Sequence, residues 1–88
     1  MSGVAVSTQD IAAAAREFER GSKESQQLLE RLEKVADGLK QGWSGETRDA
    51  FFKHQAEWHT LMRAQAAMLI SISLELRALA DRFQRADS

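Results

Sequence analysis

Two histidines with a carboxylate between them are the residues of this chain best suited to hold a metal ion. His54, Glu57 and His59 lie close together in sequence, and imidazole and carboxylate groups are common zinc ligands. At about 100° per residue, however, five positions place the two imidazoles about 140° apart around a helix. One ion cannot be bound by both from a single straight helix, so no metal site and no cofactor is predicted. The sequence instead predicts His54 in an apolar helix face, one turn from Trp58, and His59 at the surface.

No other combination of side chains predicts catalysis. The chain has no cysteine and no Gly-rich phosphate loop, and two slender helices offer no concave pocket in which a catalytic set could be assembled. The 12 Lys+Arg and 13 Asp+Glu residues give a formal net charge of -1, which lacks the basic excess that nucleic-acid phosphates require. We therefore expect a protein that is not an enzyme and does not bind nucleic acid.

Apolar residues recur at alternating intervals of three and four in two long stretches, which is the pattern of helices that pack side by side. Ser7 and Asp10 predict the N-terminal cap of the first helix. We expect helices over about residues 8–41 and 45–86 in a single domain spanning residues 1–88. The face of the first helix predicted to pack on the second comprises Ile11, Ala15, Phe18, Ser22, Ser25, Leu29, Leu32, Ala36 and Leu39. The corresponding face of the second comprises Phe51, His54, Trp58, Leu61, Gln65, Leu69, Ile72, Leu76, Leu79 and Phe83.

A short break, Gly42-Trp43-Ser44-Gly45, separates the two stretches. Gly42 is predicted to end the first helix in the left-handed conformation, and Ser44 to cap the second. A turn over about residues 42–44 produces an all-α, antiparallel two-helix hairpin. In such a hairpin, residues whose numbers sum to about 87 face each other, which sets Ser22 and Ser25 opposite Gln65 and Met62. The Gln65 amide is therefore expected to meet the hydroxyls of the first helix.

The apolar residues near the middle of the second helix cover more of its circumference than one neighbouring helix can bury. Surplus apolar surface marks a protein interface, so we expect two hairpins to associate into a four-helix bundle. Small residues of the first helix also favour a close approach there. The predicted dimer interface comprises Gly21, Ser22, Ser25, Phe52, Leu61, Met62, Ala66, Leu69 and Ile70.

The Trp43-Ser44-Gly45 triplet lies at the middle of a chain of 88 residues, with helical periodicity on both sides and no cysteine or proline. In these features the chain resembles the WXG family, the small proteins similar to the early secreted antigenic target that type VII secretion systems export. The resemblance implies a substrate that is exported as a folded helical dimer and is engaged at its C-terminal end by the membrane ATPase of the system. It also implies secretion without a cleavable signal peptide, and residues 1–6 carry neither the basic nor the apolar region of one.

The C-terminal residues contain a second pattern of this kind. Members of the family, or their partner subunits, often end in Tyr-x-x-x-Asp/Glu, which is read as part of the export signal. Phe83 and Asp87 have the same spacing, with phenylalanine in place of tyrosine. The resemblance implies an export signal here, whereas the helical pattern alone predicts the last packing residue and an ordinary terminal charge.

Several alternatives remain open at this stage. The partner is either a second copy of the chain or a paired WXG homologue. An intracellular helical adaptor or chaperone for a larger secreted effector has the same predicted fold. Stable insertion into a membrane is not expected, because the most apolar stretch, residues 66–74, is short and contains two serines.

Overall fold

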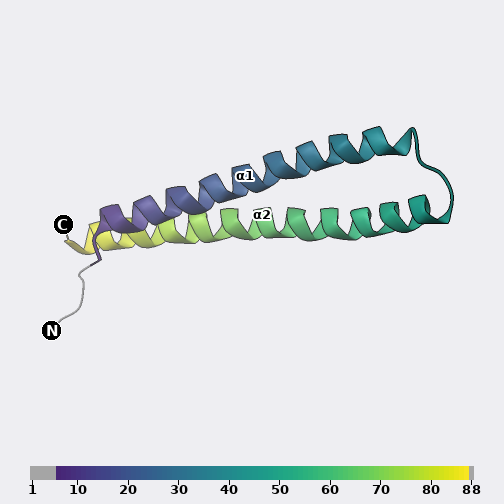
Figure 1. Cartoon of the computed structure of the whole chain (residues 1–88). Coiled ribbons are helices and arrows are strands. Elements are labelled where there is room, and N and C mark those ends of the chain that lie inside the picture. The colour runs from purple at the N-terminus through teal and green to yellow at the C-terminus, as the bar shows by residue number, and fades with distance from the viewer. Residues whose placement is uncertain (1–5, 88) are drawn as a thin grey trace.

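The computed structural model describes residues 6–87, which form two long helices joined by a short connection. Helix α1 spans Thr8–Lys40 and helix α2 spans Glu46–Asp87. The helices run antiparallel, side by side, and the chain measures 65 × 21 × 19 Å along its principal axes (Figure 1). The predicted all-α antiparallel hairpin is confirmed.

Helix α1 begins with a reciprocal pair of hydrogen bonds at its cap. The backbone N–H of Asp10 donates to the Ser7 hydroxyl at 3.1 Å, and the backbone N–H of Ser7 donates to the Asp10 carboxylate at 3.1 Å. Both bonds satisfy backbone donors that the first turn of a helix leaves without partners. Because Ser7 donates to the charged carboxylate, the pKa of Asp10 lies below its ordinary value.

The connection between the helices differs from the prediction at both of its glycines. Gln41 keeps a right-handed helical conformation after Lys40, so Gly42 is not the left-handed residue. The left-handed residue is Gly45, which has a φ of 92°. Its carbonyl accepts the first hydrogen bond of α2, from the Asp49 N–H at 3.1 Å. The N-cap position of α2 therefore belongs to Gly45 and not to Ser44. The chain completes its reversal at the last residue before α2, where only glycine avoids the steric cost of a Cβ.

The two helices meet along small side chains. On α1 the buried residues are Ile11, Ala15, Ser22, Leu29 and Ala36, and all of them belong to the predicted packing face. On α2 the buried residues are Ala66, Ser73 and Ala80, and none of them belongs to the predicted packing face of that helix. Leu61 is 70% exposed and Gln65 is also exposed, so the packing face of α2 is rotated from the predicted one.

The Ser22 hydroxyl fixes the register of the hairpin at its centre. It donates to the backbone carbonyl of Ala66 at 2.8 Å and accepts from the Gln26 side-chain amide at 3.1 Å. Its partner is thus one residue beyond Gln65, the predicted one, and the hydroxyls of α1 do not serve the Gln65 amide. A hydrogen bond from a side chain to the backbone of the facing helix requires the helices to lie close, which the small side chains at the contact allow. Gly21 lies beside the same contact, because a Cβ there would be 3.7 Å from Cδ1 of Leu69.

Candidate functional site

Aromatic side chains cover the closed end of the hairpin. The rings of Trp43 and Phe51 have centroids 5.1 Å apart, and Phe51 meets Phe52 edge to face at 5.2 Å. Lys40 and Arg48 place their cationic groups 5.3 and 5.2 Å from the Phe52 ring centroid. Trp43 is half-buried, since Phe51 supplies part of the cover that a tryptophan in a tight connection needs.

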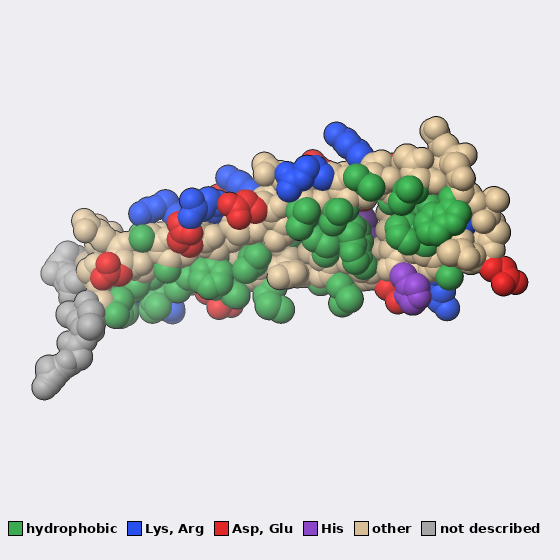
Figure 2. Space-filling model, viewed as in Figure 1, with side chains coloured by type: hydrophobic (Ala, Val, Ile, Leu, Met, Phe, Trp, Pro, Cys, Tyr) green, Lys and Arg blue, Asp and Glu red, His purple; other side chains and the backbone are tan. Residues whose placement is uncertain are grey.

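One side of the hairpin carries large apolar residues that neither helix buries. We call this the outer apolar side. Among its exposed residues are Leu28 at 40%, Val35 at 62%, Leu61 at 70% and Met68 at 63%. It comprises Leu28, Leu32, Val35 and Leu39 of α1 and His54, Trp58, Leu61, Met68, Ile72 and Phe83 of α2. Figure 2 shows hydrophobic side chains gathered over both helices on the face viewed, with charged groups toward its edges.

Near the closed end, this side is hollowed into a groove that we call the tip groove. It lies between the helices and its apolar walls come from both of them. The lining residues are Leu32, Val35, Ala36, Leu39, Phe51, His54, Gln55 and Trp58. Exposed apolar surface of this extent on a small protein marks a binding surface.

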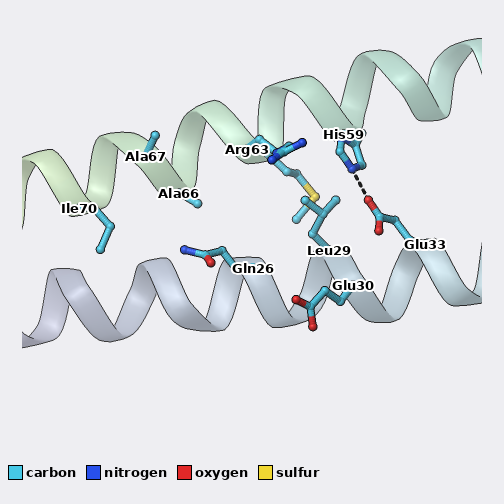
Figure 3. Close-up of a pocket in the computed structure, with 10 residues that line it drawn as sticks. Gln26, Leu29, Glu30, Glu33, His59, Arg63, Ala66, Ala67 and Ile70 are labelled. Atoms are coloured by element: carbon cyan, nitrogen blue, oxygen red, sulfur yellow. Dashed lines mark ion pairs between the residues drawn. The ribbon is translucent and has the colours of Figure 1, made fainter.

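The opposite side of the hairpin, which we call the polar side, carries charged groups from both helices, although Leu29, Met62 and Ile70 also line its groove. Here Glu33 of α1 forms an ion pair with His59 of α2, beside a groove that Gln26, Glu30 and Arg63 also line (Figure 3). The prediction that His59 is a surface group was wrong, because it faces α1 and only 29% of its side chain is exposed. His54 was predicted in the face of the second helix that packs on the first, and that prediction was wrong as well, since 78% of its side chain is exposed. Both errors arise because the face of α2 that packs on α1 differs from the predicted face by a rotation about the helix axis.

A second cross-helix pair holds the open half of the hairpin. The Arg77 guanidinium donates to the Glu19 carboxylate at 2.7 Å, and Lys23 lies 3.6 Å from the same carboxylate. The hydrogen bond from Arg77, with the charges of Lys23 and Arg77, holds the pKa of Glu19 below its ordinary value.

Arg77→Gln is expected to raise the pKa of Glu19 toward its ordinary value, because the charged donor is lost. A carboxyl whose pKa is lowered by folding stabilises the fold above its unfolded pKa, and that stabilisation disappears as the pH falls through the folded pKa. The variant should therefore lose less stability than the wild type when acidified over that range. NMR titration of the Glu19 side-chain carbon measures the shift, with Arg82→Gln as the control. An unchanged Glu19 titration in the Arg77 variant would contradict the assignment.

The predicted dimer-interface residues fall in three places. Ser22 and Ala66 are buried between α1 and α2, so they are not available to a second chain. Met62 and Ile70 line the groove on the polar side. The other five residues stay a prediction. Gly21, Ser25 and Leu69 line a shallow groove with Leu28. Leu61 is exposed on the outer apolar side, and Phe52 lies at the closed end of the hairpin.

Sequence reasoning missed two residues of the outer apolar side, Leu28 and Val35. Their signal was present, since Leu28, Leu32, Val35 and Leu39 recur at intervals of four, three and four. This spacing did not lead to the prediction of an exposed row, because Leu32 and Leu39 were assigned to the contact with the second helix.

The predicted export signal lies in the last turns of α2. Phe83 is 40% exposed, and the helix continues to Asp87, so the two residues are separated by about one turn. Among residues 6–87, no group of three His, Cys, Asp or Glu side chains is placed to hold a metal ion. Neither helix of that region is long and apolar enough to cross a membrane.

Comparison with known proteins assigns this hairpin to a family. The model of the WXG100 family, proteins of 100 residues with WXG, matches residues 3–88. The chain therefore belongs to the WXG100 family, the secreted, non-enzymatic proteins of type VII secretion. Proteins of this family typically dimerise.

Two solved structures illustrate the likeness. The secreted protein EsxB from Bacillus anthracis strain Sterne is 25% identical and superimposes with a TM-score of 0.90, covering 100% of both chains. EsxA from Geobacillus thermodenitrificans is 20% identical with a TM-score of 0.88, covering 97% of this chain and 92% of that one. No curated protein sequence matches the chain.

Proposed function

We propose that this protein is exported by a type VII secretion system as a folded pair of hairpins and acts by binding other proteins. The observation that carries the proposal is the outer apolar side, on a chain that belongs to a family of secreted, typically dimeric proteins. An apolar side of this size has to be covered before a folded protein can travel through an aqueous path. Secretion of the related EsxB supports the same route.

Two parts of the hairpin have separate roles in this proposal. The closed end, shaped by Trp43 and Gly45, keeps the helices side by side. The C-terminal turns of α2, with Phe83 and Asp87, are the part that the membrane ATPase of the system engages. Export then depends on the fold and on the C-terminal turns, and it requires no catalytic turnover by this chain.

Export from cells tests the proposal. The protein should accumulate in the medium of cells with an active secretion ATPase and stay inside cells in which that ATPase is inactivated. Trp43→Ala and Phe83→Ala should reduce export at least tenfold relative to the matched surface variant Arg82→Ala. Retention of the wild-type protein in cells with an active system would favour an intracellular adaptor or chaperone and overturn the proposal. Normal export of both variants would contradict the roles given to Trp43 and Phe83.

A further inference from the structure

A long recess between the helices opens on the polar side. Two hollows lie along it, one at the middle of the hairpin and one toward the closed end, and the Glu33–His59 ion pair lines both. We call the two hollows together the polar groove. On α1 it extends from Gln26 to Lys40, which is about 21 Å at 1.5 Å per residue. A helix of about four turns has the same length.

The floor of the polar groove is apolar along much of its length. Leu29, Met62 and Ile70 line its central part. Phe52 lines the part near the closed end. One helical turn beyond Ile70, Leu74 is 61% exposed. Large apolar side chains therefore line the groove and continue past its end.

The exposed part of this floor lies on a different face of α2 from the outer apolar side. Leu74 and Met68 are six positions apart, which is about 120° around a helix, and Ile70 is about 160° from Met68. A partner that covers the outer apolar side therefore leaves Leu74 in water. In the pair of hairpins proposed above, each polar groove stays open, and its apolar surface can be buried only by another molecule.

Charged side chains flank the floor on both helices. Glu30 and Asp37 lie on the α1 flank seven positions apart, so they share one face and are separated by about 10 Å along the axis. Figure 3 shows Glu30 on the edge of α1 away from α2. Arg63 lies on the α2 flank. Within residues 6–87 the side chains of these three residues form no ion pair or hydrogen bond, whereas Glu33 is already paired with His59.

We infer that the polar groove binds an amphipathic helix of another protein. The apolar stripe of that helix covers the floor, two basic residues seven positions apart meet Glu30 and Asp37, and an acidic residue on its other flank meets Arg63. Positions seven apart recur on one face of a helix, so a single helix can present both basic groups at the spacing of the two carboxylates.

The two kinds of contact have separate roles in this binding. Apolar anchors supply the affinity when a helix lies in a groove, and complementary charges at the edges set its orientation and exclude other partners. The inference rests on the proposed function, in which the protein acts by binding other proteins. It adds the kind of partner and the face of the hairpin that receives it.

A pair of designed peptides tests the inference on the purified full chain. The basic probe is a helical peptide of roughly 20 residues, long enough to form a helix, with leucines along one face, lysines seven positions apart on one flank and glutamates on the other. The control peptide has its lysines and glutamates exchanged. Fluorescence anisotropy should give a dissociation constant at least about tenfold lower for the basic probe. Equal binding of the two peptides, or binding of neither, would overturn the inference.

Variants of the chain locate the bound peptide. Leu74→Ala and Glu30→Gln should each weaken binding of the basic probe at least about fivefold, since one removes apolar contact and the other a charge. The matched controls are Leu61→Ala, a leucine on the outer apolar side, and Glu75→Gln, about 180° around α2 from Ala66, and both should bind the probe like the wild type. All four positions are exposed, so the variants keep the hairpin, which circular dichroism verifies.

Sedimentation separates this surface from the interface between hairpins. Leu74→Ala should leave the mass of the purified chain unchanged. Peptide binding that falls in Leu61→Ala but not in Leu74→Ala, or a Leu74→Ala chain that loses its partner hairpin, would overturn the assignment of the polar groove. These measurements need no secretion system, so their failure is distinguishable from a failure of export.

Discussion

Ala66→Leu is expected to destabilise the hairpin by roughly 3 kcal/mol, because the added carbon atoms force α1 and α2 apart at a buried contact. Ala66 is 4% exposed, and its carbonyl accepts the Ser22 hydroxyl at 2.8 Å. The larger side chain must displace atoms packed around Ala66, and separating the helices also breaks that buried hydrogen bond. A loss of this size lowers the melting temperature of a domain of about this length by at least about 10 °C.

The neighbouring alanine provides the control for this experiment. Ala67 is exposed, so Ala67→Leu adds the same atoms to α2 at a position that is open to solvent. It should change stability by no more than about 0.5 kcal/mol. Thermal unfolding followed by circular dichroism measures both variants. Equal melting temperatures for the two leucine variants would mean that Ala66 does not face α1.

Gly45→Ala is expected to cost about 1–2 kcal/mol, since alanine at a φ of 92° brings its Cβ against its own backbone. Space is not the cause, because a Cβ at Gly45 would meet nothing within 4 Å. Gly42→Ala is the matched control. Gly42 has equally open surroundings and does not have a positive φ, so its replacement should leave stability unchanged or raise it slightly.

Urea unfolding of the two alanine variants gives the comparison. The family motif contains Gly45 and not Gly42, and the expected difference in stability supplies a physical reason for that choice. If Gly42→Ala proves to be the more damaging change, the reversal of the chain must take place at Gly42, as the sequence pattern alone predicts.

The antiparallel hairpin and the packing face of α1 were predictable from the sequence. Ser7 and Asp10 have the spacing of a capping box, and Ile11, Ala15, Ser22, Leu29 and Ala36 follow a helical period. Only Leu32 and Leu39 of the predicted face belong instead to the outer apolar side. Such predictions succeed because the cap chemistry and the apolar period indicate the same helix.

The packing face of α2 was not predictable by the same means. Hydropathy favours Leu61, Ile72 and Leu79, but the residues that α1 buries are Ala66, Ser73 and Ala80. Two apolar rows compete on this helix. The row of small residues permits the closer contact and forms the hairpin, which leaves the row of large residues outside. A prediction based only on hydropathy therefore assigns the row of large residues, and not the row of small residues, to the contact with α1.

The prediction of the dimer interface contained the same error. Ser22 was assigned to the dimer interface, as well as to the packing face, because it is small, and Ala66 because it belongs to the surplus apolar residues of the second helix. Both residues in fact serve the contact between α1 and α2. The residues that remain exposed, Leu61 and Met68 among them, became visible as a surface only when the rotation of α2 was known.

Sedimentation equilibrium of the purified chain alone tests the central claim, that a second copy covers the outer apolar side. The chain has a mass of 9.8 kDa, so the account predicts a species of twice that mass, 2 × 9.8 = 19.6 kDa, at micromolar concentration. Met68→Asp should convert it to a helical monomer, since Met68 is 63% exposed on the outer apolar side and an aspartate there would be buried without a partner once that side is covered. A wild-type chain that remains a folded 9.8 kDa monomer at high concentration would contradict the account.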